Sequence, residues 1–190
     1  MRSRQGRGRG LGCGRVRGCD NVDMELAVTV IGPDRPGIVA DVAGALSALG
    51  ANLTDSTMTR LRGHFAMTLI CTTSADAAQV ESALDGLDDL IVTVREVGQD
   101  RRTPATEVSF LLSVHGADRL GIVAAVTRAI ADAGGNITDL STRLTGSLYV
   151  LLAEVDLPVA AMDPVNVRLA ELAAALEVEV SLRPIEADLL

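Results

Sequence analysis

The chain has 190 residues, of which 48% are hydrophobic and only 2% aromatic, so its cores have to be built from aliphatic side chains. All 17 basic residues are Arg, and 25 acidic residues bring the formal net charge to −8. Residues 1–22 carry six Arg and one acid, which leaves 11 Arg against 24 acids, a net charge of −13, on the remaining residues. A surface that acidic repels a phosphate backbone, which argues against direct nucleic-acid binding by residues 23–190.

The cysteines and the hydropathy pattern argue against several other classes of protein. Cys13 and Cys19 lie in the N-terminal segment and Cys71 in a predicted strand, and this spacing matches no disulfide framework or metal cluster. No stretch approaches the roughly 18 apolar residues that cross a membrane, and no apolar core of a secretory signal follows the basic residues. We therefore expect a cytoplasmic protein with no membrane association, no metal site and no cofactor.

The N-terminal segment, residues 1–22, is rich in Arg and Gly and has almost no side chain that could anchor a core. Alternating Arg and Gly can bind RNA as a disordered arm. In the other interpretation the segment is not translated, and the protein starts near Met24, where the composition changes sharply. Both interpretations place this segment outside the fold.

An internal repeat organises the rest of the chain. The octet GPDRPGIV that begins at Gly32 returns 84 positions later, at Gly116, as GADRLGIV. The same offset aligns GANLTD, which begins at Gly50, with GGNITD, which begins at Gly134. A constant offset without insertions indicates two copies of one folding unit, and two copies are too few for a solenoid. We expect two small domains, at residues 23–97 and 107–190, joined by a polar linker at residues 98–106.

Six elements are predicted in the first copy. A Val-rich strand (25–31) enters the Gly32-Pro33 turn, and a helix follows whose apolar residues recur every three or four positions from Ile38 to Leu49. We expect Asp34 to cap this helix, Pro36 to lie in its first turn and Gly50 to end it. The remaining elements are strands 52–60 and 64–73, a helix capped by Ser74 and a strand at 90–97.

The second copy repeats this order. Its predicted elements are strand 107–115, helix 120–133, strands 136–145 and 147–155, a helix opened by Asp163-Pro164 and running to 176, and strand 177–183. The last strand alternates strictly, with Val178, Val180 and Leu182 on one face, which is typical of a sheet packed on one side. Each copy is then an α+β, ferredoxin-like β-α-β-β-α-β sandwich whose two helices share one sheet face. The open faces and the edge strands remain available for pairing.

The turn between the first strand and the first helix has residues suited to holding a charged ligand. Free backbone N–H groups and the positive end of the helix dipole meet there and favour a carboxylate, while Asp34 or Asp118 could receive an ammonium group. Gly and Asn at the start of the next strand are expected at the same end of the sheet. The alternative is purely structural: Asp caps the helix, Gly turns the chain and Asn tolerates the turn.

Together these motifs resemble the ACT domain, a small regulatory module that senses amino acids. The resemblance covers residues 25–97 and 107–185 and rests on DRPGIV and GANL in the first copy and on DRLGIV and GGNI in the second; Leu120 departs from the family's Pro. A tandem protein without a third domain is similar to the ACT-only regulators, which include the glycine cleavage system transcriptional repressors. The resemblance implies ligand binding at interfaces between ACT units by Asp34, Arg35, Gly37, Ile38, Asn52, Leu53, Thr54, Asp118, Arg119, Gly121, Ile122, Asn136, Ile137 and Thr138.

Two functions remain open at this stage. The leading hypothesis is a non-catalytic regulator that binds a small amino acid such as glycine or serine, forms a homodimer and signals to a protein partner. The pathway expected from the resemblance is glycine or one-carbon metabolism. The alternative is a ligand-free interaction module whose sheets pair. We expect no enzyme, because His64 and His115 do not recur at matching positions and no nucleophile–base pair can be assembled. His115 precedes the turn and could touch a ligand, although a strand-end histidine with its own hydrogen bond is the simpler interpretation.

Overall fold

The structure is a computed structural model that describes residues 24–87, 89–98 and 107–185. The N-terminal segment and all of the predicted linker except Gly98 lie outside the described residues. The chain divides into two compact units, with the division between Arg101 and Arg102. Each unit holds one copy of the repeat and is described by itself.

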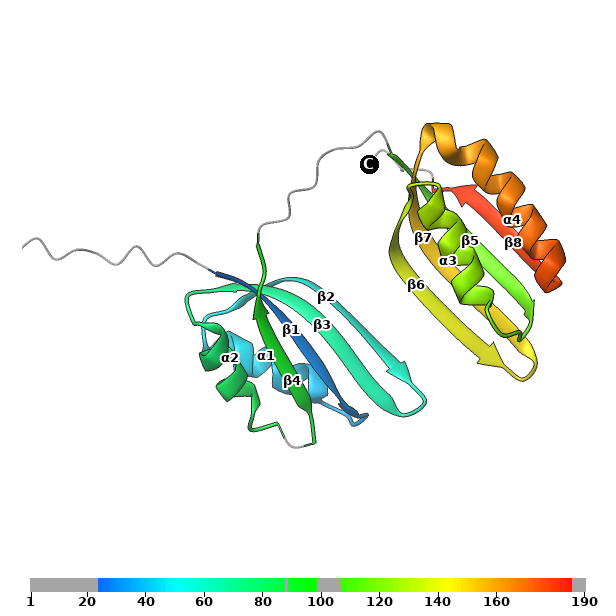
Figure 1. Ribbon diagram of the computed structural model, residues 1–190. Helices are drawn as coiled ribbons and strands as arrows, with labels where there is room; N and C mark the ends of the chain where they lie inside the picture. Colours follow the sequence, from blue (N-terminus) through cyan, green and yellow to red (C-terminus); the bar gives the residue numbers. More distant parts are fainter. Residues whose placement is uncertain (1–23, 88, 99–106, 186–190) are drawn as a thin grey trace, which may run out of the picture. The chain divides into compact units, whose positions relative to one another are not determined.

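The first unit has the order β-α-β-β-α-β (Figure 1). Its strands form an antiparallel sheet in the order β2-β3-β1-β4, so that the first strand lies in the interior of the sheet. The elements are β1 (Met24–Pro33), α1 (Ile38–Ala48), β2 (Asn52–Leu61), β3 (His64–Thr73), α2 (Ala77–Leu84) and β4 (Ile91–Glu96).

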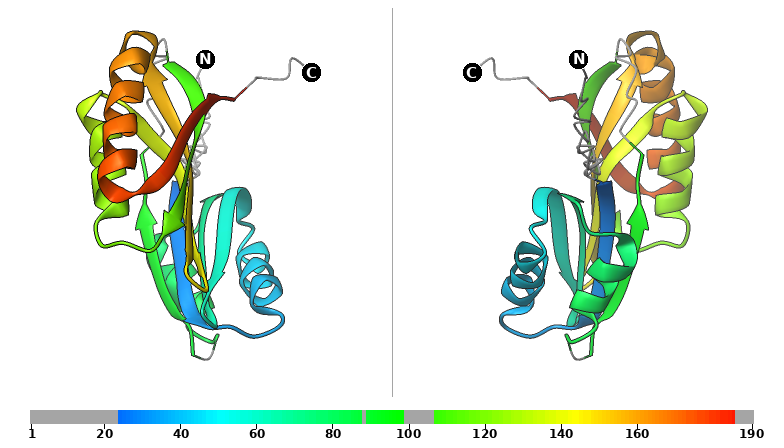
Figure 2. Two further views of the ribbon diagram at one scale, coloured as in Figure 1. Left: turned by 90° about the vertical axis from the view of Figure 1, so that its right-hand side faces the viewer. Right: turned by 90° about the vertical axis from the view of Figure 1, so that its left-hand side faces the viewer.

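The second unit repeats the architecture, with sheet order β6-β7-β5-β8. Its two helices cover the same face of the sheet, as the views in Figure 2 show. The elements are β5 (Glu107–Ala117), α3 (Ile122–Asp132), β6 (Asn136–Thr145), β7 (Leu148–Pro158), a 3-10 turn (Val159–Ala161), α4 (Met162–Leu176) and β8 (Val178–Pro184). The predicted α+β, ferredoxin-like fold is therefore confirmed in both copies.

Each unit has its own aliphatic core on the helix-covered face of its sheet. Alternate residues of the central strands point into it, as the period of two predicted. In the first unit the predicted inward face of β3, from Phe65 to Cys71, is at most 5% exposed. In the second unit the core includes Phe110, Leu112 and Leu151, each at most 1% exposed. Each core therefore consists mainly of aliphatic side chains packed around one buried Phe, in keeping with the low aromatic content.

Strand register decides which ends of the elements lie together. In the first unit Pro33, at the end of β1, pairs with His64 at the β2–β3 hairpin, and Leu26, near the start of β1, pairs with Cys71. Asn52, at the start of β2, pairs with Thr72 and therefore lies at the opposite end of the sheet from the β1–α1 turn. The expectation that both motifs share one end was wrong, because α1 runs back along the sheet before β2 begins.

Helix starts also differ from the predictions. Gly37 and not Asp34 occupies the N-cap of α1, and no side chain caps that helix. For α2 the N-cap is Asp76 instead of Ser74, and it forms a capping box. The Asp76 carboxylate accepts from the backbone N–H of Gln79 at 2.8 Å, and the Gln79 side-chain oxygen accepts from the backbone N–H of Asp76 at 2.9 Å. The fourth helix begins at Met162, one residue before the predicted Asp163, because a 3-10 turn leads into it.

Candidate functional site

The clearest candidate site lies at the turn between β5 and α3. A cavity of about 620 Å³ opens there, lined by residues of the turn, by the first residues of α3 and by Tyr149 of β7. This volume falls within the roughly 300–1,000 Å³ typical of small-molecule sites. Four of the predicted site residues line this cavity: Asp118, Arg119, Gly121 and Ile122.

The start of α3 supplies this cavity with hydrogen-bond donors. The first helical bond of the main chain runs from the Ala125 N–H to the Gly121 carbonyl at 2.9 Å, and no side chain caps the helix. The amides of residues 122–124 therefore have no partner within the helix, as at the first turn of any α-helix. Gly121 has φ 93°, a left-handed conformation that favours glycine, and a Cβ added there would meet open space. Uncapped amides and the helix dipole favour an anionic group in the cavity.

Tyr149 is the residue of this cavity that sequence reasoning missed. It is half-buried and pairs across the sheet with Gly116, directly before the turn. Its equivalent in the first copy is Phe65, which pairs with Gly32 and is only 1% exposed. Alignment of the two copies could have identified this residue, because Tyr149 has a hydroxyl that the equivalent Phe65 lacks.

The second motif forms a separate cavity at the other end of the same unit. It measures about 530 Å³, lies between α3 and the start of β6, and includes Thr127, Arg128, Asn136 and Ile137. Asn136 pairs with Asp156 at the far end of β7, whereas Ala117 beside the turn pairs with Leu148. Within one unit the structure therefore does not bring the two motifs together.

Several predicted site residues have structural roles that the pattern alone does not reveal. Thr54 and Thr138 lie at β-bulges, and their hydroxyls donate to the carbonyls of Ile70 and Glu154, each at 3.3 Å. Ile38 and Ile122 are at most 2% exposed and belong to the two cores, as do the half-buried Leu53 and Ile137 that pack against them. Asn52, by contrast, is exposed at the start of β2.

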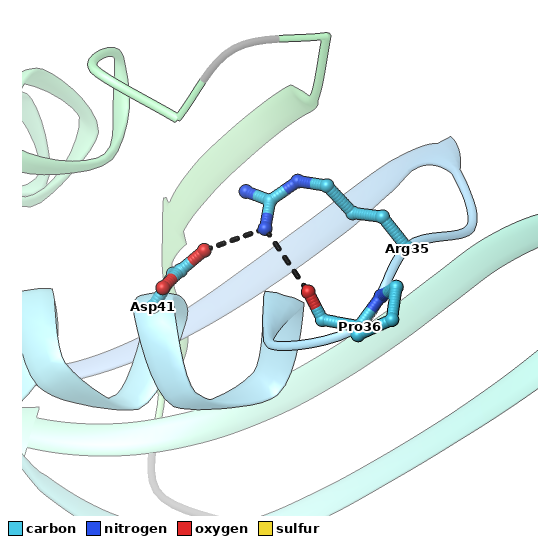
Figure 3. A network of polar contacts seen from close by, with 3 residues as sticks. All are labelled: Arg35, Pro36 and Asp41. Atoms are coloured by element: carbon cyan, nitrogen blue, oxygen red, sulfur yellow. Dashed lines mark hydrogen bonds and ion pairs between the residues drawn. The ribbon is translucent and has the colours of Figure 1, made fainter.

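In the first copy, ion pairs engage the charged residues of the turn. Arg60 of β2 contacts the Asp34 carboxylate at 3.3 Å. Arg35 turns toward its own helix, where its Nη1 lies 2.8 Å from the Asp41 carboxylate and 3.4 Å from the Pro36 carbonyl (Figure 3). Gly37 again has a left-handed φ of 92°. The two turns thus share their backbone and differ in how their charges are paired.

The charged residues around the second turn contact the start of the last strand. Arg119 pairs with Glu177, which ends α4 in a left-handed conformation. His115 Nε2 lies 2.9 Å from the Glu179 carboxylate on the open face of the sheet, and His115 does not line the cavity. The interpretation of His115 as a strand histidine with its own partner agrees with this contact.

Within residues 24–87, 89–98 and 107–185, no group of three or more His, Cys, Asp or Glu side chains is placed to hold a metal ion. No helix in these ranges is long and apolar enough to cross a membrane.

Comparison with known proteins bears on this geometry. The chain is 27% identical over 157 residues to the glycine cleavage system transcriptional repressor of Escherichia coli K12, covering 80% of this chain and 82% of that protein. It is 37% identical over 62 residues to a UPF0237 protein of Listeria monocytogenes, covering 33% of this chain and 65% of that protein. A crystal structure of a protein from Galdieria sulphuraria aligns with a TM-score of 0.76 and 30% identity, covering 86% of this chain and 99% of that one.

A family model of the ACT domain matches twice, over residues 25–95 and 109–183. Both matches contain the Gly-rich turn and the Gly-Asn strand start described above. The chain belongs to the ACT domain family, with two domains in tandem.

Proposed function

We propose that this protein is a non-catalytic regulator that binds a small amino acid, of the glycine or serine class, at its ACT turns and signals to a protein partner. The observation that carries the proposal is the cavity at the β5–α3 turn, where the Asp118 carboxylate and the uncapped amides of α3 line one space. A free amino acid presents the complementary pair of charges, because an ammonium pairs with Asp118 and a carboxylate accepts from amides.

The relation to a glycine cleavage system transcriptional repressor supports a role in regulating glycine or one-carbon metabolism in the cytoplasm. With a net charge of −13 on residues 23–190, such regulation would act through a protein partner and not through DNA contact.

We further propose that the chain forms a homodimer. A ligand held by both the turn and the start of the next strand needs two ACT units in antiparallel orientation, since each unit carries these motifs at opposite ends of its sheet. In a dimer such a site would join Asp118 of one copy of the chain to Asn136 of the other. The exposed edge strands β2 and β6 offer unpaired backbone for this association.

Thermal unfolding of the full chain, scanned against the twenty amino acids at millimolar concentration, tests the proposal. A ligand at a hundredfold excess over its Kd stabilises the native state by about 2.7 kcal/mol, which raises the unfolding midpoint. The shift should disappear in Gly121→Val, whose side chain fills the cavity. Gly146→Val is the matched control, because Gly146 also has a left-handed φ, of 63°, and open space around its Cβ but does not line the cavity. No shift with any amino acid would refute the proposal.

A ligand-free interaction module is the second candidate. It is favoured by apolar side chains on the sheet faces that the helices leave open: Ile31 and Ile91 are 46% and 73% exposed, and Leu111, Leu148 and Leu152 are 40–48% exposed. Light scattering at several protein concentrations should then show an association that no amino acid alters. Association that strengthens with glycine or serine would instead support the sensor.

A further inference from the structure

We infer that the two ACT units are not equivalent, and that the tighter amino-acid site is the turn of the second unit, with Asp118 and Tyr149 as its ligand-contacting side chains. In the first turn Arg60 forms an ion pair with the matching Asp34 and competes with a ligand. This inference rests on the proposed function and assigns it to one of the two copies.

Strand register identifies the matching positions of the two copies. Arg60 pairs with Phe65 across β2 and β3, and Leu144 pairs with Tyr149 across β6 and β7. Both pairs also lie 84 positions apart in sequence, so Arg60 corresponds to Leu144 and Phe65 to Tyr149. Two positions that face the turn therefore change chemistry between the copies.

The first change removes a competing cation. In the first unit the Arg60 guanidinium contacts Asp34 at 3.3 Å, which is the place that a ligand ammonium would take. In the second unit Leu144 cannot form this contact. Among the described residues of the chain, no side chain forms an ion pair or hydrogen bond with the Asp118 carboxylate. Asp118 is thus available to a ligand, whereas Asp34 must first release Arg60.

The second change adds a hydrogen-bonding group to the cavity wall. Phe65 is fully packed in the first core, but its equivalent Tyr149 is half-buried and lines the second cavity. Within the described ranges no protein group hydrogen-bonds the Tyr149 hydroxyl. An apolar ring with a polar tip at the wall of a cavity suits a small ligand whose own side chain is polar. The arrangement therefore favours serine-like over purely aliphatic amino acids.

The arginine of each turn, Arg35 or Arg119, also differs between the two copies in its partner. Arg35 stays with its own turn and helix, close to the Pro36 carbonyl and Asp41. Arg119 instead reaches out to Glu177, away from its helix, and remains part of the cavity wall. Both arginines are therefore ion-paired, Arg35 with a residue of the helix that follows it and Arg119 with the residue that ends α4.

Isothermal titration of the full chain with glycine and L-serine tests the inference. Variants that place the residue of one copy at the matching position of the other serve as internal controls. The wild type should bind one equivalent per chain at the second unit and a further equivalent at the first unit with a higher Kd, because a surface ion pair such as Arg60–Asp34 weakens a site without closing it. Asp118→Asn should weaken binding by about tenfold or more, because a hydrogen-bonded charge pair is lost. Leu144→Arg is an exposed substitution that gives Asp118 the partner that Asp34 has, and it should raise the Kd about two- to fivefold, as expected of a surface ion pair.

Two further variants complete the design. Arg60→Leu should free Asp34 and lower the Kd of the weaker site about two- to fivefold. Tyr149→Phe should weaken serine binding about two- to tenfold while leaving the unfolding midpoint of the free protein unchanged, since Phe is the residue that the first copy carries.

The outcomes separate this inference from the proposed function. Two equivalents of equal Kd in the wild type, or an unchanged Kd of the tighter site in Leu144→Arg and Asp118→Asn, would overturn the assignment to the second unit while the sensor function stands. An unchanged Kd of the weaker site in Arg60→Leu would contradict the role of Arg60. No binding of any amino acid to the wild type would overturn both the assignment and the function.

Discussion

At the residue scale, the glycines of the repeated octet have two distinct roles. Gly37 and Gly121 supply a left-handed backbone; an added Cβ would lie 4.0 Å from the Arg35 guanidinium at Gly37 and would meet open space at Gly121. Gly32 and Gly116 are required by packing instead, because the end of β1 or β5 passes close to the segment that leads into the last strand. A Cβ on Gly32 would lie 2.5 Å from the Asp89 carbonyl, and one on Gly116 would lie 2.9 Å from a Val178 methyl. The repeat preserves a close contact within the fold as well as a candidate site.

Gly32→Ala should destabilise the first unit. The new methyl would overlap the backbone around Asp89, and such overpacking costs about 1–3 kcal/mol. Gly44→Ala is the control, because Gly44 lies inside α1 with no atom within 4 Å of an added Cβ, and alanine there should stabilise the helix by about 0.5–1 kcal/mol. Urea unfolding of the two variants should give shifts of opposite sign, and equal shifts would contradict this explanation of Gly32.

Cys71 should react slowly in the native protein. It lies in the first core at 0% exposure, and burial raises the pKa of its thiol, so that less thiolate forms at a given pH than in the unfolded chain. Iodoacetamide labelling followed by peptide mapping measures the labelling of Cys71 separately from that of the other cysteines. Labelling of Cys71 should rise sharply in denaturant, and equal labelling in the native and denatured protein would contradict its burial.

At the element scale, helix starts are where sequence and structure diverge most. Asp34, Ser74 and Asp76 are all good capping residues, and only Asp76 caps a helix in the structure. Asp76 caps α2 because Gln79 lies three residues after it, so that each side chain accepts a hydrogen bond from the backbone N–H of the other residue. In α1 tertiary context decides, because the Asp34 carboxylate pairs with Arg60, a residue far away in sequence.

Asp76→Ala should lower the stability of the first unit by about 1 kcal/mol, the usual effect of losing an N-cap. Ser74→Ala is the matched comparison and should have almost no effect, although sequence reasoning had named Ser74 as the cap. Denaturant unfolding of both variants checks the assignment. A larger loss in Ser74→Ala than in Asp76→Ala would show that the capping box does not form.

The sequence predicted the fold well because periodicity depends only on neighbouring residues, and because the repeat is visible when two stretches of the sequence are compared directly. The inward face of β3 and the buried positions of α1 follow directly from spacings of two and of three to four. The candidate site was predicted only in part. Which end of the sheet holds Asn52, and whether Arg60 reaches Asp34, depend on strand register and on contacts between distant residues. Tyr149 was missed because the motif was sought in the turn and not across the sheet.

At the scale of the whole molecule, the two units have separate cores with no residue in common. Each core is enclosed by its own sheet and helix pair, and each unit is of a size that can fold alone but with a small stability margin. We therefore expect the two units to respond independently to substitutions in their cores. Independence matters for function, because ligand binding to the second unit would then stabilise that unit first.

Leu112→Ala should destabilise only the second unit. Leu112 is 1% exposed in the centre of β5, and truncation of a buried Leu costs about 2–5 kcal/mol. Hydrogen exchange read segment by segment in the full chain should then speed up across β5 to β8 and remain unchanged across β1 to β4. Leu69→Ala, at an equally buried position in the first unit, should produce the reverse pattern. Faster exchange across both units in either variant would show that they unfold as one cooperative body, and ligand stabilisation of the second unit would then reach the first directly.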